Sequence, residues 1–176
     1  FSKLHFDHLL FTGSAAWSEQ EYNGVVGLAT LDQGEWRLED PVVEAVGVNN
    51  ELERAHVVAR NGLYYLFWST QRHVFAPDGP SGPNGLYGMV AKTITGPYEP
   101  LNGTGLVAAN PPEAPYQAYS WWVSQDLSVA AFIDLTGLDG QKPVDDPKWR
   151  RAHFGGVPAP RFRIELDGSR ARVAKG

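Results

Sequence analysis

Hydrophobic positions along this chain gather in short runs. Apolar and aromatic runs of four to eight residues alternate with clusters of Gly, Pro, Asn and Asp, and no stretch keeps a 3.6-residue period. This pattern predicts an all-β fold and argues against an all-α one. We expect strands at Asp7–Thr12, Val25–Thr30, Trp36–Leu38, His56–Arg60, Tyr64–Thr70, Leu86–Ala91, Val107–Ala109, Ser120–Val123, Ser128–Ile133 and Arg161–Leu166.

Turn residues separate these runs, and one pair has a specific turn type. Asn61-Gly62 lies between two apolar runs. A two-residue type I′ turn requires positive φ at both central positions, which Asn and Gly tolerate best. The pair therefore predicts a β-hairpin.

A faint repeat organises the expected strands. Gly24–Ala29 is echoed by Gly85–Ala91, 85 − 24 = 61 positions later, and each copy follows an aromatic strand. A third aromatic strand, Val129–Asp134, lies about one repeat further on. Repeats of several strands are typical of β-propeller blades, although chance similarity among strands is the alternative.

The number of repeats has a consequence for the architecture. A closed propeller needs ~4–8 blades of four strands, and 176 residues provide about three. We therefore interpret residues 1–176 as a partial β-propeller, its C-terminal blades. Another chain or a missing N-terminal segment would complete it, because an exposed sheet edge invites aggregation.

Composition narrows the class of protein. The net charge of −5 is spread along the chain, so no basic stripe points to nucleic acid as a partner. No apolar run approaches the ~20 residues that cross a membrane, so a membrane is likewise not expected as a partner. The chain lacks cysteine, which excludes disulfides and thiolate chemistry.

The segment 51–58 carries the candidate chemistry. Glu51 and Glu53 share one side of an extended chain, while Arg54 points to the other side unless a bend re-aims it. Two carboxylates and an arginine ahead of an aromatic strand could form an acid/base site. A solvated polar turn between two strands is the alternative interpretation.

An ordered series of motifs resembles glycoside hydrolase family 68, the levansucrases, inulosucrases and β-fructofuranosidases. These motifs are spread over about three quarters of the chain, from residue 22 to residue 156, and they are Tyr22–Ala29, Leu52–Val58, Asn61–Phe67, Phe75–Pro77, Gly85–Gly88, Gly96–Val107, Asn110–Glu113, Tyr116–Trp122 and His153–Gly156. The resemblance implies a five-bladed propeller that cleaves sucrose with retention, transferring fructose to water or to a fructosyl acceptor.

The resemblance also implies roles for individual residues. Glu53 corresponds to the general acid/base and Arg54 to an arginine that contacts sugar hydroxyls. Glu51 corresponds to a second acidic residue of the pocket and Tyr119 to a tyrosine that lines the substrate site. Gln71 stands where relatives carry arginine or histidine near the glucosyl or acceptor subsite, which puts polymer formation in doubt. No cofactor or metal is implied.

Two catalytic aspartates of the family have no counterpart here. The nucleophile belongs to the first blade, and an Arg-Asp-Pro motif precedes the strand that matches Leu9–Thr12. Asp7, Asp40 and Asp146 lack the required context. We therefore expect the chain to be inactive alone and to need an N-terminal polypeptide that carries both aspartates, in a heterodimer or a nicked chain. The resemblance also implies an extracellular or periplasmic location.

Two other functions stay open: a catalytically inactive carbohydrate-binding propeller module, and a structural propeller fragment without a sugar site. Of Trp121 and Trp122, at most one can face a pocket, because neighbours in a strand face opposite ways. The histidines lack the spacing of a zinc site. Residues 145–151 are expected to form a solvated loop.

Overall fold

In the computed structural model, described for residues 7–114, 118–139 and 141–175, the chain forms three antiparallel sheets. The first sheet contains β1 (His8–Ser14), β2 (Asn23–Asp32), β3 (Glu35–Leu38) and β4 (Val43–Val46). The middle sheet contains β5 (Glu53–Arg60), β6 (Leu63–Thr70), β7 (Gly85–Ala91), β8 (Glu99–Pro100) and β9 (Leu106–Ala109). The last sheet contains β10 (Ala118–Val123), β11 (Ser128–Leu135), β12 (Phe154–Pro158), β13 (Phe162–Asp167) and β14 (Arg170–Val173). Helical structure within the described ranges is limited to α1 (Pro147–His153) and the 3₁₀ turns η1 (Arg72–Val74) and η2 (Leu101–Gly103).

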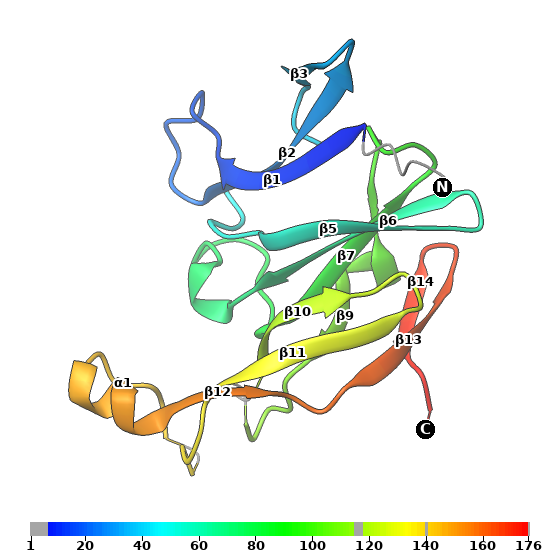
Figure 1. Ribbon diagram of the computed structural model, residues 1–176. Helices are drawn as coiled ribbons and strands as arrows, with labels where there is room; N and C mark the ends of the chain where they lie inside the picture. The colour runs from blue at the N-terminus through cyan, green and yellow to red at the C-terminus, as the bar shows by residue number, and fades with distance from the viewer. Residues whose placement is uncertain (1–6, 115–117, 140, 176) are drawn as a thin grey trace.

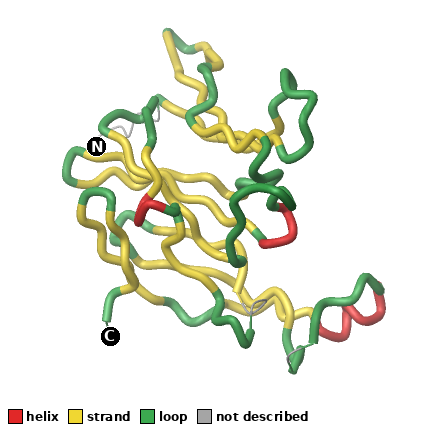
Figure 2. Tube along the Cα trace, turned by 180° about the vertical axis from the view of Figure 1, so that it is seen from behind, coloured by secondary structure: helices red, strands yellow, loops and turns green. Residues whose placement is uncertain are grey.

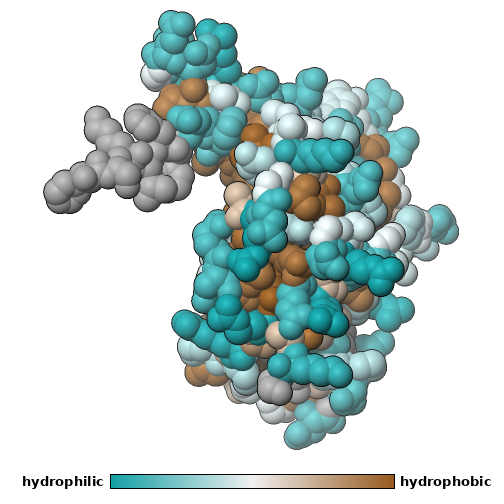
Figure 3. Space-filling view, turned by 90° about the vertical axis from the view of Figure 1, so that its right-hand side faces the viewer, coloured by the Kyte–Doolittle hydropathy of each residue, from teal (hydrophilic) through white to brown (hydrophobic). Residues whose placement is uncertain are grey.

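The sheets follow one another in space in the order of the sequence (Figure 1). One core cluster, which includes Val26, Leu52 and Leu66, joins the first sheet to the middle sheet. A second cluster, which includes Phe67 and Trp121, joins the middle sheet to the last. Apolar surface gathers in the middle of the face seen in Figure 3, with polar side chains around it.

Strand β6 explains how the middle sheet serves both clusters. Its run of aromatic and aliphatic residues is buried on both faces, and successive side chains alternate. Tyr65 and Phe67 pack toward the last sheet, whereas Leu66 and Trp68 pack toward the first. A continuously apolar strand therefore marks the central sheet of the stack.

The repeat noted in the sequence has a structural basis. Phe11 of β1 is the cross-strand partner of Gly27 in β2, and Phe67 of β6 is the partner of Gly88 in β7. In both pairs a Cβ on the glycine would collide with the phenylalanine ring. The glycine thus makes room for an aromatic ring that lies across the neighbouring strand, in the same place in two sheets.

The first sheet has an apolar face that the described residues leave uncovered. Phe11 pairs with Gly27, Leu9 and Leu38 both pair with Ala29, and Trp36 pairs with Leu31, so these residues share one face. Exposure there is 50% for Leu9, 40% for Phe11, 50% for Trp36 and 79% for Leu38. Val26 and Leu28, on the opposite face, are fully buried. Apolar patches of this kind mark interaction surfaces.

The Asn61-Gly62 hairpin is confirmed, because these residues have φ values of 53° and 74° and join β5 to β6. Strands β4, β8, β12 and β14 were not predicted. Strand β8 has only two residues and β12 contains Gly155 and Gly156, so the apolar pattern is weak in both.

The prediction of a loop at 145–151 is wrong for residues 147–151, which belong to helix α1. Asp146 caps α1 by accepting hydrogen bonds from the backbone N–H groups of Lys148 and Trp149, and Pro147 occupies the first turn. Arg150 pairs with the exposed Asp145 at 3.2 Å. Figure 2 shows this helix on an arm that projects from the strand-built body. No residue of α1 is buried, so the sequence shows no apolar stripe there.

Candidate active site

Three of the predicted site residues lie at one end of the middle sheet, where β5 begins and β6 ends. Glu53 begins β5, and its register partner is Ser69 in β6. Gln71 comes two residues after Ser69, in extended conformation and just before η1. It therefore lies near the same end of the sheet. Glu51 precedes β5, and its backbone N–H donates to the side-chain oxygen of buried Asn49 at 2.7 Å. The approach of the chain to Glu53 is therefore fixed by an internal hydrogen bond.

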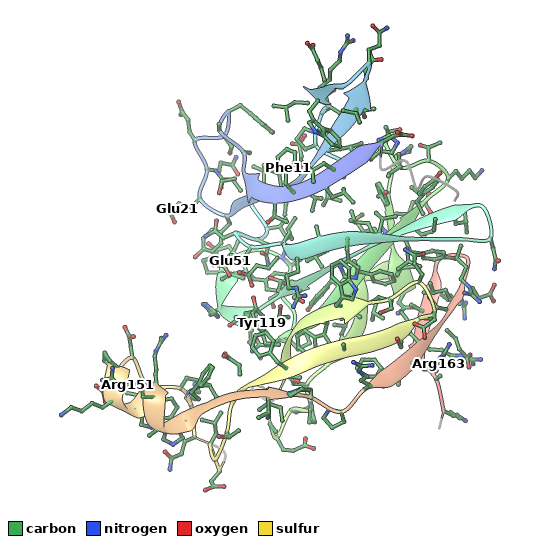
Figure 4. The ribbon with its side chains drawn as sticks, viewed as in Figure 1. Phe11, Glu21, Glu51, Tyr119, Arg151 and Arg163 are labelled. Carbon is green, nitrogen blue, oxygen red and sulfur yellow. The ribbon has the colours of Figure 1, made fainter. Side chains whose placement is uncertain are left out.

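Tyr119 comes from the last sheet to the same side of the molecule. Figure 4 shows Glu51 and Tyr119 near the ends at which β5 and β10 begin. The Tyr119 ring packs edge-on against Trp121 and Phe132, with centroid distances of 6.3 Å in each case. Its phenolic oxygen is buried and has no hydrogen-bond partner among the described residues, and its neighbours Tyr116 and Gln117 lie outside them.

The environment of Glu53 favours the protonated carboxyl. Burial raises the pKa of Glu53, the like charge of Glu51 raises it further, and the charge of His73 lowers it in part. The side chain is only half-buried. A carboxyl whose pKa is raised and that still reaches solvent suits a general acid.

Arg54 is re-aimed by a β-bulge. Its φ is +54°, and the β5–β6 register shifts between Glu53 and His56. Its guanidinium donates through Nη1 to the hydroxyl of Ser120 at 2.6 Å and to the Ser120 carbonyl at 3.1 Å. It also lies 5.7 Å from the centre of the Trp122 ring. The guanidinium of Arg54 is therefore bonded to β10.

The partner strand carries a matching irregularity. The β10–β11 register shifts between Tyr119 and Trp122, and Ser120 has a φ of +58°. The expected alternation of the two tryptophans is confirmed: Trp121 is 3% exposed in the core and Trp122 is 42% exposed. Strands β5 and β10 are therefore both irregular at the positions where Arg54 meets Ser120.

Sequence reasoning missed three residues of this region as parts of the site. Ser120 and Asn49 hold Arg54 and Glu51, and His56, considered only as a metal ligand, bonds β5 to β10. The bonds of Ser120 and His56 span 66 and 67 positions, so no local pattern reveals them. For Asn49, the two-residue spacing to Glu51 is the one available signal, because Asn accepts from the N–H two residues on.

Two hollows lie against the last sheet. The smaller, of about 340 Å³, is lined by Arg54, Ser120, Trp122 and parts of β11 and β12. The larger, of about 830 Å³, is lined mainly by 112–114, 135–139 and 141–142, and Glu53 is not part of its lining. Of the five predicted site residues only Arg54 lines either one.

Among residues 7–114, 118–139 and 141–175, no three His, Asp or Glu side chains gather as metal ligands. In the same part of the chain, no helix has the length and apolar character needed to cross a membrane.

Comparison with known proteins agrees with this arrangement. The family described as levansucrase/invertase, glycoside hydrolase family 68, matches residues 5–175. A levansucrase of Zymomonas mobilis is 48% identical over 142 residues, and one of Rahnella aquatilis is 41% identical over 155 residues. These matches cover 80% and 86% of this chain.

Solved structures give the same result. The inulosucrase from Halalkalicoccus jeotgali bound to kestose has a TM-score of 0.83 and 44% identity over 94% of this chain. The levansucrase from Gluconacetobacter diazotrophicus has a TM-score of 0.69 and 28% identity over 86%. The chain spans 31% and 35% of the two curated relatives and 46% of the inulosucrase, so it corresponds to part of such a protein.

Proposed function

The chain belongs to the levansucrase/invertase family, glycoside hydrolase family 68, and we propose from this that it forms the proton-donating part of a retaining, sucrose-cleaving β-fructofuranosidase or fructosyltransferase. Its three sheets would be the C-terminal blades of a five-bladed propeller. The observation that carries the proposal is the raised pKa of Glu53, at the beginning of β5 and beside Glu51 and Arg54.

Glu53 acts twice in the proposed reaction. Its carboxyl donates a proton to the glycosidic oxygen, so glucose leaves while an aspartate forms a bond to the anomeric carbon of fructose. The Glu53 carboxylate then removes a proton from water or from a sugar hydroxyl, whose oxygen displaces the aspartate. The attacking molecule decides between hydrolysis and transfer.

The other residues would hold the substrate. Arg54, at the edge of the smaller hollow, has donors left beyond Nη1 for sugar hydroxyls. The charge of Glu51 would help to raise the pKa of Glu53, and Tyr119 would line the substrate site. Gln71 lies near the glucosyl or acceptor side and would favour short products over polymer.

The nucleophile and the Arg-Asp-Pro aspartate would come from an N-terminal polypeptide, in a heterodimer or a nicked chain. One feature supports this: the first sheet exposes Leu9, Phe11, Trp36 and Leu38 on one face. A preceding blade packed on that face would bury it. The assembly would act outside the cytoplasm, as an exported protein.

The test compares native material, purified together with its partner polypeptides, with the same material carrying Glu53→Gln. Glucose and fructose released from sucrose are measured. We expect the variant to lose about a thousandfold, the contribution typical of proton transfer to a poor leaving group. Glu99→Gln, at an exposed glutamate in β8, is the matched control and should keep full activity. Sugar binding without turnover in the native material would instead indicate a carbohydrate-binding module.

A further inference from the structure

His56 is a buried histidine that uses both ring nitrogens to join the two bent strands. Nδ1 lies 2.8 Å from the Arg54 carbonyl oxygen, and Nε2 lies 2.9 Å from the backbone nitrogen of Val123. A carbonyl only accepts and a backbone N–H only donates. The ring is therefore the neutral tautomer with its proton on Nδ1, and it is 5% exposed.

Aromatic contacts hold this ring in place. The imidazole stacks on Trp122 at 4.1 Å with an angle of 20° and lies 5.8 Å from Phe67. Trp122 in turn contacts the guanidinium of Arg54. Imidazole, indole and guanidinium thus form one cluster across β5 and β10, the histidine-arginine-tryptophan cluster.

The bond to the Arg54 carbonyl acts where the backbone is strained. A non-glycine residue in the left-handed region is strained, and it persists only when its surroundings impose it. Bulges beside active sites serve to re-aim side chains. His56 holds the carbonyl of the residue that adopts φ +54°, directly after Glu53.

We propose that His56 is a positioning residue, which holds the Arg54 peptide in its left-handed bulge and thereby fixes the directions of Glu53 and Arg54. The proposal rests on the proposed function of Glu53. His56 itself touches no reacting atom. Displacement of a proton donor by about 1 Å costs on the order of a hundredfold in rate.

The test uses three variants of the complete sucrose-cleaving material. His56→Phe keeps a stacking ring and loses both hydrogen bonds. His56→Asn retains a donor near the position of Nδ1, whereas His56→Gln retains an acceptor near the position of Nε2. His153→Phe is the matched control, because His153 also stacks on a tryptophan, Trp149, at 4.0 Å and bonds a backbone carbonyl through Nδ1.

We expect His56→Phe to lower kcat on sucrose about a hundredfold, with a smaller rise in KM because Arg54 is displaced as well. Its loss on 4-nitrophenyl β-fructofuranoside, whose leaving group needs little proton donation, should be much smaller. His56→Asn should recover more activity than His56→Gln, since only Asn keeps the bond to Arg54. Equal losses on both substrates, or better rescue by Gln, would mean that His56 only braces the strands and would overturn the proposal.

Nitrogen-15 NMR of the unmodified protein gives an independent readout if a variant fails to fold. We expect a slowly exchanging proton on Nδ1 of His56 at neutral pH. A proton on Nε2 would overturn the proposal whatever the kinetics. If the unmodified protein cleaves no fructoside, the proposed function fails, while this spectrum still decides whether His56 holds the bulge.

Discussion

Arg54 and Ser120 lie 66 positions apart, and both adopt left-handed backbone at the point where the guanidinium of Arg54 donates to the hydroxyl and carbonyl of Ser120. Two irregular strands therefore meet through one charged group. The bond of 2.6 Å to the hydroxyl is a charge-assisted one, of the kind worth about 1.5–3 kcal/mol.

Ser120→Ala removes this hydroxyl and leaves the backbone bond. We expect KM for sucrose to rise about tenfold, since a freed guanidinium must be ordered again when it binds sugar hydroxyls. The decrease in kcat should be smaller. Steady-state kinetics of the complete enzyme measure both constants, and an unchanged KM would show that Ser120 does not hold Arg54 for binding.

Glu51 and His73 should move the pH profile in opposite directions. The alkaline limb of kcat/KM reports loss of the proton from the donor. Glu51→Gln removes a charge that raises the pKa of Glu53, so this limb should move to lower pH. His73→Gln removes a charge that lowers it, so the limb should move to higher pH. Shifts in the same direction would contradict the assignment of Glu53 as the donor.

His56 should make stability depend on pH. Burial, with a smaller contribution from the charge of Arg54, lowers the pKa of His56 to about 4, while its hydrogen bond to the Arg54 carbonyl opposes the shift. In the unfolded chain the pKa is ~6.5. Between these values the unfolded state binds a proton that the folded state does not. The free energy of unfolding should therefore fall by about 3 kcal/mol as the pH drops from 7 to 4.

Denaturant unfolding of the protein and of His56→Phe across this pH range checks the prediction. Other groups titrate in both proteins, so the difference between the two curves isolates His56. A difference that does not change with pH would show that the imidazole is not held neutral in the folded state.

The two glycines that face phenylalanine rings should differ in tolerance. A Cβ on Gly88 would lie 2.8 Å from the Phe67 ring and 2.9 Å from Leu101, and both side chains are fully buried. Gly88→Ala should cost about 1–3 kcal/mol. Gly27→Ala meets Phe11, which is 40% exposed and can turn aside, so it should cost clearly less. Chemical denaturation measures both, and equal losses would contradict this account of the repeat.

Local patterns in the sequence were enough for most of the strands and for the hairpin, but not for β4, β8, β12 and β14. Asn61-Gly62 specifies its turn through two adjacent residues, and β6 through a continuous apolar run, so neither depends on distant partners. Helix α1 was missed although Asp146-Pro147 is a helix-start signal. With seven residues and none buried, it lacks the periodic stripe on which the prediction relied.

The residues of the candidate site could be proposed from the sequence, but their geometry could not. Regular alternation would place the side chains of Arg54 and Glu53 on opposite faces of the strand. The bulge changes the direction of the Arg54 side chain, which bonds to Ser120 of β10. The same holds for His56, whose partner Val123 is 67 positions away. Contacts of this length depend on how two sheets stack, which no local window of sequence contains.

The central claim is that Glu53 is the proton donor over a fructose whose nucleophile lies outside this chain. In the complete enzyme carrying Glu53→Ala, turnover of 4-nitrophenyl β-fructofuranoside is measured with and without azide. Azide needs no deprotonation, so it should attack the fructosyl-enzyme, displace the carboxylate, raise the rate and give β-fructosyl azide with retained configuration. No acceleration, or an α-fructosyl azide of inverted configuration, would contradict the account.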